Sequence, residues 1–132
     1  MISDKLLVSE RFPRSSQYHP EWIASSISGA ANSLWMTEWL TTTLDLRPGM
    51  RVLDLGCGRA ASSIFLRREF GAEVWATDLW FSASENMQRI PACFQSMRML
   101  ACCVRRGVLR RFKKWVLVAS VTQIQALLRW PC

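Results

Sequence analysis

The chain has 132 residues, of which half are apolar and a fifth are charged, and its formal net charge is +7. These values are typical of one globular domain and exclude a collagen, a mucin-like stalk and a disordered acidic tail. No run of about 18 apolar residues occurs, so we expect no membrane-spanning helix. The first residues have no basic segment followed by an apolar core, and the five cysteines are an odd number. We therefore expect a cytoplasmic location with reduced thiols.

The charge is divided unevenly along the chain. Residues 1–85 hold all ten acidic residues and eight basic ones, whereas residues 86–132 hold nine basic residues and no acidic one. Average composition would place roughly five acidic residues in a segment of that length. We therefore expect two parts: residues 1–90, which carry the recognisable pattern described below, and a basic, acid-free tail over residues 91–132.

The first predicted helix follows a polar, turn-rich stretch over residues 11–33. Asn32 or Ser33 is expected to cap it, because their side-chain oxygens accept free amide hydrogens of the first turn. Pro48 is expected to end it, because proline cannot continue a helix. Apolar side chains recur at helical spacing along it, and we predict that its two tryptophans are core residues. The stripe consists of Trp35, Trp39, Leu40 and Leu44.

A strand, a glycine loop, a helix and a second strand are predicted next. The expected elements are a strand over Arg51–Leu55, a loop at Gly56-Cys57-Gly58, a helix from Ala60 to Phe70 that Gly71 terminates, and a strand over Glu73–Ala76. The first of these is a short β-branched and leucine run, which is consistent with a buried parallel strand. Asp78 follows the second strand, twenty residues after Gly58. The pattern predicts an α/β fold built on one βαβ unit.

This spacing favours a nucleotide site at the strand ends. A strand that ends in Gly-x-Gly lets the backbone turn tightly and approach a ligand, and the next helix points its free amide groups to the same place. Asp78, at the tip of the neighbouring strand, can accept both hydroxyls of a ribose. We expect Cys57 to be a small filler in the loop, since no histidine or second cysteine lies near it in the sequence.

The motifs VLDLGCGRA and ATDLW resemble the first two motifs of class I S-adenosylmethionine-dependent methyltransferases, and the resemblance extends over residues 20–90. It implies a partial Rossmann-like methyltransferase fold with a helix before the βαβ unit. It further implies S-adenosylmethionine as cofactor, a small-molecule methyl acceptor, and a truncated chain of doubtful activity. No catalytic residue and no metal ligand follow from it.

The resemblance also assigns cofactor-binding residues. Asp54 and Leu55 end the first strand, and Asp54 would orient the methionine end of the cofactor. Gly56, Cys57 and Gly58 would line the loop beneath the cofactor. Asp78 would hold the ribose, and Leu79 and Trp80 would flank the adenine. Dinucleotide dehydrogenases share the βαβ unit, but they usually lack an acid two residues before the first glycine, which favours the methyltransferase.

The tail does not continue this pattern. A complete sheet of this class needs more strands after Asp78, but residues 91–132 show no strand-end acid. We therefore expect a sheet of only two strands and a chain of marginal stability, because parallel strands need both faces covered. We also hypothesise that the tail is translated from shifted reading frames. Codons of residues 93–100 that begin one base earlier permit V-F-P-I-H-A-D-A, which is similar to the third strand of this family and the acidic motif at its end. Codons of residues 104–111 read from their second base permit F-A-A-E-F-F-D-A, which is similar to the stretch that leads into the family's fourth strand.

The alternative function is a non-enzymatic binding protein. Residues 104–118 form a basic amphipathic stretch that can bind nucleic acid or an anionic membrane surface. A metal site at the tail cysteines is disfavoured, because Cys102 and Cys103 are adjacent and no C-x-x-C motif occurs.

Overall fold

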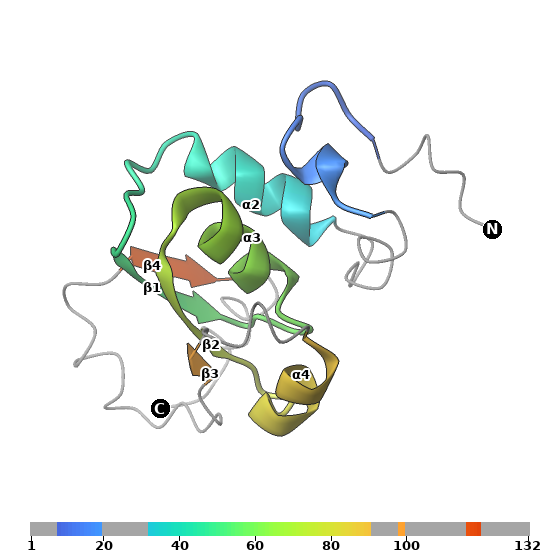
Figure 1. Cartoon of the computed structure of the whole chain (residues 1–132), viewed down its shortest axis with the longest axis vertical. Coiled ribbons are helices and arrows are strands. Elements are labelled where there is room, and N and C mark those ends of the chain that lie inside the picture. Colours follow the sequence, from blue (N-terminus) through green and yellow to red (C-terminus); the bar gives the residue numbers. More distant parts are fainter. Residues whose placement is uncertain (1–7, 20–31, 91–97, 100–115, 120–132) are drawn as a thin grey trace, which may run out of the picture.

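The structure is a computed structural model that describes residues 8–19, 32–90, 98–99 and 116–119 (Figure 1). Its elements in chain order are η2 (Ser15–Gln17), α2 (Ser33–Thr41), β1 (Arg51–Leu55), α3 (Ala61–Phe70), β2 (Glu73–Thr77), α4 (Ala83–Arg89), β3 (Arg98–Met99) and β4 (Val116–Ala119). The four strands form one parallel sheet in the order β3-β2-β1-β4. The fold is therefore mixed α/β, and its strand order equals that of the first four strands of a doubly wound sheet.

Strand β1 lies inside the sheet. It pairs with β2 from Arg51 to Leu55 and with β4 from Val52 to Leu55. All four residues after Arg51 are buried, as expected for a parallel strand covered on both faces. The expectation of a two-strand sheet was therefore wrong, because the tail supplies β3 and β4. Strand β3 has only two residues, too few for an apolar pattern to predict it. The apolar run of β4 was instead interpreted as the end of the basic amphipathic stretch over residues 104–118.

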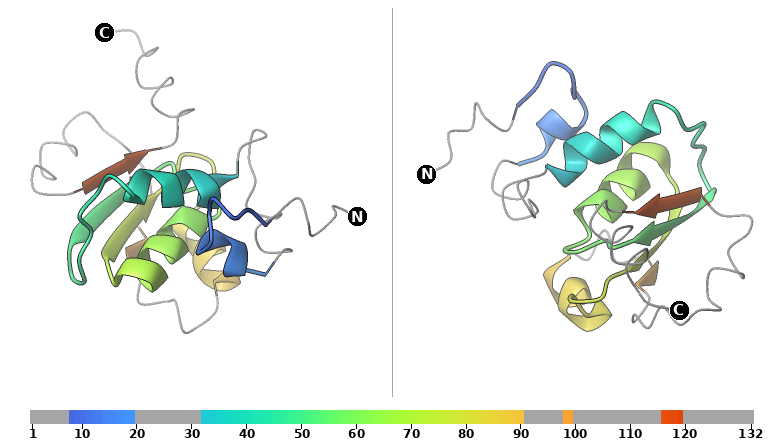
Figure 2. Two further views of the ribbon diagram at one scale, coloured as in Figure 1. Left: turned by 90° about the horizontal axis from the view of Figure 1, so that it is seen from above. Right: turned by 180° about the vertical axis from the view of Figure 1, so that it is seen from behind.

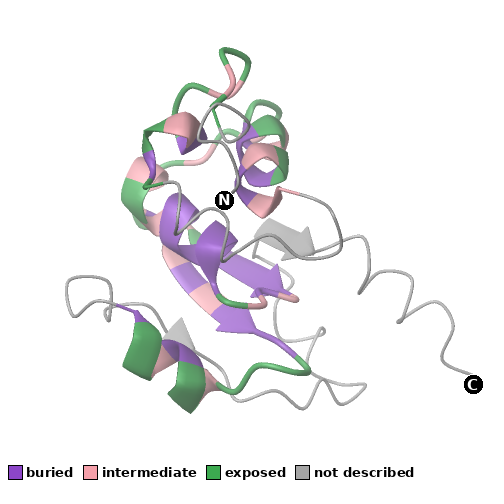
Figure 3. Cartoon of the chain, turned by 90° about the vertical axis from the view of Figure 1, so that its right-hand side faces the viewer, coloured by how far each residue is buried: buried purple, intermediate pink, exposed green. Residues whose placement is uncertain are grey.

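Helices α2 and α3 lie on the same face of the sheet (Figures 1 and 2). Helix α3 packs on β2, and α2 packs against α3. Figure 3 shows β1 and β2 largely buried, whereas α4 is mostly exposed. Two buried clusters join these layers. One contains Tyr18, Leu34, Ala61 and Phe65; the other contains Val52, Leu66, Ala72 and Val74.

The predicted boundaries of the βαβ unit agree with the structure to within a residue. Gly71 terminates α3 in the left-handed conformation, with φ 64°. Within the described ranges, no helix is long and apolar enough to cross a membrane.

Helix α2 differs from its prediction in length and in its buried face. Asn32 caps it as predicted, since its side chain accepts the N–H groups of Leu34 and Trp35. The helix ends at Thr41, well before Pro48. The hydroxyls of the three consecutive threonines there donate to carbonyl oxygens three residues earlier, which competes with continued helix. The interpretation of the tryptophans as core residues was wrong: Trp39 is 53% exposed and Trp35 is half-buried.

The buried face of α2 is mostly polar and contains Leu34, Thr37, Glu38 and Thr41. The hydrogen-bond donors to Glu38 lie 23 and 24 positions earlier in the sequence. Its carboxylate accepts the backbone N–H of Arg14 at 3.0 Å and of Ser15 at 2.8 Å, and the Ser15 hydroxyl at 2.5 Å. These bonds hold the segment around η2 against α2, so the tryptophan stripe is turned outward.

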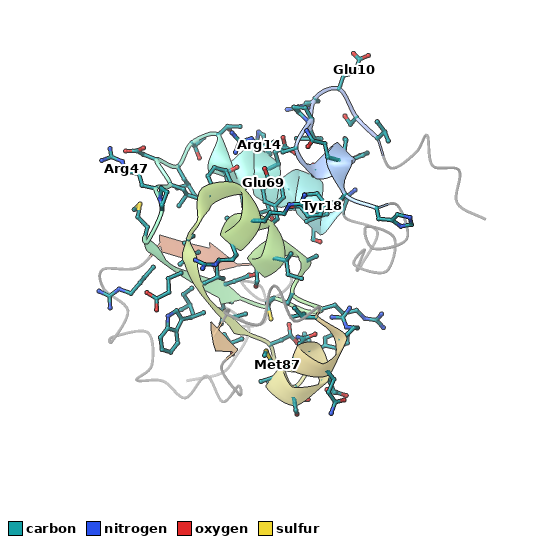
Figure 4. All side chains as sticks on the ribbon, in the orientation of Figure 1. Glu10, Arg14, Tyr18, Arg47, Glu69 and Met87 are labelled. Carbon is teal, nitrogen blue, oxygen red and sulfur yellow. The ribbon has the colours of Figure 1, made fainter. Side chains whose placement is uncertain are left out.

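The same amino-terminal segment also contacts α3. The Tyr18 hydroxyl donates to Glu69 Oε1 at 3.0 Å, and Figure 4 labels both side chains at this contact. Burial, and then the neighbouring carboxylate, raises the pKa of Tyr18 above its ordinary value. The phenol therefore stays protonated and keeps its donor role at physiological pH.

Candidate functional site

The glycine loop turns sharply after β1 and is tied to the end of β2. Gly56 and Gly58 have φ of 83° and 52°, a region that favours glycine. Ala60, at the amino end of α3, also has a positive φ, of 64°. The N–H groups of Gly56 and Cys57 donate to the Thr77 carbonyl at 2.8 and 3.1 Å. The loop is therefore held at the carboxyl ends of β1 and β2.

Asp78 binds this loop directly and is only 7% exposed. Its Oδ2 accepts the Gly58 N–H at 2.8 Å, and its Oδ1 accepts the N–H groups of Trp80 at 2.8 Å and Phe81 at 3.1 Å. An ionised carboxylate offers about four acceptor positions, so one position on Oδ2 remains. The role of Asp78 in holding a ribose stays a prediction.

Asp54, at the end of β1, is 2% exposed and faces the first turn of α3. Its Oδ2 accepts the hydroxyls of Ser62 and Ser63, each at 2.6 Å. Burial raises the pKa of Asp54, the two serine hydrogen bonds lower it, and the charge of Asp78 raises it further. The net direction is upward. The sequence analysis missed both serines, although their place at the start of the helix after Gly-x-Gly was a usable signal.

Helix α4 holds the loop from its other side, which the sequence analysis also missed. Asn86 is 1% exposed and donates from Nδ2 to the Gly58 carbonyl at 2.8 Å. Arg89 donates from Nη2 to the Arg59 carbonyl at 2.6 Å and to Asn86 Oδ1 at 2.7 Å. Nothing in the sequence distinguishes Asn86 from an ordinary surface residue, because its partner is 28 positions away.

Apolar side chains follow Asp78 on the surface. Leu79 is 59% exposed, Trp80 67% and Phe81 38%. The Arg59 guanidinium lies over the Phe81 ring, 5.6 Å from the ring centroid, which is within the distance of about 6 Å expected for a cation–π contact. Leu79 and Trp80 thus provide exposed apolar surface beside the Asp78 carboxylate, and their contact with an adenine stays a prediction.

The structure brings five of the predicted site residues together at one edge of the sheet: Asp54, Gly56, Cys57, Gly58 and Asp78. Leu55 is 3% exposed and Cys57 6%, so both pack inward. The basic stretch over residues 104–118 lies outside the described residues apart from β4. The tail cysteines also lie outside them, so the nucleic-acid, membrane and metal interpretations of the tail stay predictions.

No protein-family model matches this sequence, and no curated protein matches it. Among solved structures, the chain is similar to geranyl diphosphate C-methyltransferase from Streptomyces coelicolor A3(2), whose crystal structure is in complex with Mg²⁺, geranyl diphosphate and S-adenosyl-L-homocysteine. The identity is 21% and the TM-score 0.47, over 74% of this chain. The chain spans only 38% of the length of that enzyme.

Proposed function

We propose that this chain is the amino-terminal part of a class I S-adenosylmethionine-dependent methyltransferase domain, with a partial Rossmann-like fold, and that it binds this cofactor at the glycine loop. The observation that carries the proposal is the placement of two buried carboxylates, Asp54 and Asp78, at the ends of neighbouring parallel strands with the loop between them. Ligands of parallel α/β sheets bind at the carboxyl ends of the strands.

The negative charge of the Asp54 carboxylate favours this cofactor over a dinucleotide. A pyrophosphate would lie at the amino end of α3, where free N–H groups attract anions. Asp54 already presents a carboxylate there, hydrogen-bonded to Ser62 and Ser63. An ammonium or sulfonium group is attracted to that carboxylate, whereas a pyrophosphate is repelled. The nearest cationic side chain of the loop, Arg59, is turned onto the Phe81 ring.

The residues present fit the cofactor in chemistry. Asp54 would orient the methionine end of the cofactor, through its amino group or a water. Asp78 would hold the ribose, and Leu79 and Trp80 would flank the adenine. Gly56 and Gly58 keep side chains out of the loop beneath it; a Cβ added at Gly58 would meet open space, but at a strained φ. When bound, the cofactor supplies a methyl group on a sulfonium sulfur for transfer to a small-molecule acceptor. Binding is therefore the readout that tests this site directly.

The test is isothermal titration of the full chain with S-adenosylhomocysteine and, separately, with NADH. We expect S-adenosylhomocysteine to bind at least about tenfold more tightly than NADH, a difference of about 1.4 kcal/mol. Asp78→Asn and Gly56→Val should each weaken S-adenosylhomocysteine binding by about tenfold or more. Asp45→Asn is the matched control, since Asp45 is an exposed carboxylate paired with Arg47 on the surface. Tighter NADH binding, or full affinity in Asp78→Asn, would contradict the proposal.

A further inference from the structure

Two side chains of the short helix α4, Asn86 and Arg89, bind the backbone of the glycine loop and are called the α4 pair. Asn86 donates from Nδ2 to the Gly58 carbonyl at 2.8 Å, and Arg89 donates from Nη2 to the Arg59 carbonyl at 2.6 Å. Within the described part of the chain, these are the side-chain hydrogen bonds that join α4 and its cap to the rest of the fold. The helix and the loop therefore position each other.

The orientation of the Asn86 amide follows from its contact with Arg89. The Arg89 Nη2 atom lies 2.7 Å from Asn86 Oδ1. A guanidinium can only donate, so the Asn86 oxygen faces Arg89 and the NH₂ group faces the Gly58 carbonyl. Asn86 is 1% exposed, whereas Arg89 lies at the surface. The exposed residue thus holds the buried amide in the orientation that binds the loop.

Gly58 is held through both of its backbone polar groups. Its carbonyl accepts from Asn86, and its N–H donates to Asp78 Oδ2 at 2.8 Å. The other oxygen of Asp78 accepts the N–H groups of Trp80 and Phe81, which lead into α4. Hydrogen bonds therefore form a closed ring from Gly58 through Asp78 and α4 back to Gly58. This ring fixes a residue whose φ of 52° only glycine adopts easily.

The order of the loop matters because a glycine loop meets a ligand with its backbone. Its first half is fixed by β2, since the N–H groups of Gly56 and Cys57 donate to the Thr77 carbonyl. The carbonyl groups of its second half, Gly58 and Arg59, are bound by the α4 pair. A loop that is ordered before the ligand arrives loses less conformational entropy on binding. The apparent affinity falls in proportion to the fraction of molecules that hold the binding arrangement.

From these observations we infer that Asn86 and Arg89 are positioning residues that hold the glycine loop in its binding arrangement and thereby set its affinity for the cofactor. Asn86 acts on Gly58 directly. Arg89 acts on Arg59 and, through the amide of Asn86, on Gly58. The inference rests on the proposed function of the loop as the S-adenosylmethionine site.

The test is calorimetric titration of the full chain with S-adenosylhomocysteine. Arg89→Met keeps the apolar stem but removes the donors, and we expect binding to weaken by about tenfold, as when the loop holds its binding arrangement about a tenth of the time. Arg89→Lys restores a cationic donor and should bind within about threefold of the parent. Arg47→Met is the matched control, because it removes a surface guanidinium that is paired with Asp45, and it should leave the affinity unchanged.

Asn86→Asp tests the buried member of the pair. It keeps an oxygen toward Arg89 but places a second oxygen against the Gly58 carbonyl, so we expect binding to weaken by at least about tenfold. Because Arg89 lies at the surface, its two variants decide the inference even if Asn86→Asp fails to fold.

The amide resonance of Gly58 separates positioning from damage to the site. It should differ between the parent and Arg89→Met without ligand and coincide at saturating S-adenosylhomocysteine, because the ligand selects the same loop arrangement in both chains. Parent affinity in Arg89→Met, an equal loss in Arg89→Lys, or Gly58 resonances that still differ at saturation would each overturn the inference. Absence of binding by the parent chain would instead overturn the proposed function, and the inference with it.

Discussion

Buried carboxylates occur in two regions of this molecule, and their hydrogen bonds differ. Glu38, on α2, receives two backbone N–H groups and one hydroxyl on its two oxygens, and all three come from the amino-terminal segment. Asp54 receives two serine hydroxyls on a single oxygen, and its pKa is raised by burial. Asp78 receives three backbone N–H groups but lies beside exposed apolar side chains. The three carboxylates are therefore similarly buried but bind different parts of the chain.

The difference separates a fastening role from a binding role. Both oxygens of Glu38 bind the amino-terminal segment, which Tyr18 also ties to α3, so this carboxylate is used within the fold. Asp54 and Asp78 lie where two strands end and a glycine loop begins. Glu38 and Asp78 each accept three hydrogen bonds, so their places in the fold distinguish them. A carboxylate at the carboxyl ends of parallel strands favours a ligand site, whereas one inside a helix contact favours a structural role.

The largest effect is expected from Glu38→Gln. The amide can accept on one atom only and would direct its NH₂ group at donors, so we expect the free energy of unfolding to fall by about 3 kcal/mol. Urea denaturation measures this loss. A change of less than about 1 kcal/mol would show that Glu38 does not fasten the segment.

Asp78→Asn should loosen the loop without unfolding the chain. The N–H groups of Gly58, Trp80 and Phe81 lose a charged acceptor, so we expect their hydrogen exchange to accelerate by about tenfold, which corresponds to about 1.4 kcal/mol. Exchange at the N–H of Leu53, in the middle of β1, is the internal control and should not change. Uniform acceleration along the chain would mean that Asp78 supports the whole fold instead of the loop.

Ser15→Ala should have a smaller effect than Glu38→Gln. It removes one hydroxyl, and the two backbone N–H bonds to Glu38 remain, so we expect a loss of about 1 kcal/mol in the free energy of unfolding. The same urea experiment measures it. A loss as large as that of Glu38→Gln would place most of the fastening in the hydroxyl.

Asp54→Asn should change how stability depends on pH. Because burial raises the pKa of Asp54 in the folded chain, the native state binds more protons than the unfolded state between the two pKa values. The parent chain should therefore lose stability, relative to Asp54→Asn, as pH rises from the unfolded pKa of about 3.9 through the folded one. Urea unfolding of both chains from about pH 3.5 to pH 7 measures the difference. If the free energy of unfolding changed with pH in the same way for both chains, burial would not raise the pKa of Asp54.

The central elements were predictable because their signals are local. An apolar run followed by Gly56 and Gly58 defines the end of β1, and Gly71 defines the end of α3. The burial of Glu38 was not predictable, since its donors lie 23 and 24 positions away and a tryptophan is ordinarily the better core residue. Asn86 was missed for the same reason.

The tail shows a further limit of local signals. Strand β3 pairs at the edge of the sheet with only two residues, for which the sequence alone predicts no strand, and the apolar run of β4 lies in a stretch that was interpreted by its basic charge. The pairing of β3 and β4 with the sheet does not test the hypothesis that residues 91–132 are translated from shifted reading frames. Sequencing the coding DNA from an independent template would test it.

The most direct test of the cofactor site is to follow the backbone amide resonances of the full chain during titration with S-adenosylhomocysteine. The account predicts saturable shifts concentrated at Gly56, Gly58 and Trp80, with one dissociation constant for all three. The amides of Trp35 and Trp39, on the outer face of α2, should remain in place. Absence of shifts at the loop at saturating ligand, or shifts confined to α2, would contradict the assignment of the glycine loop as the cofactor site.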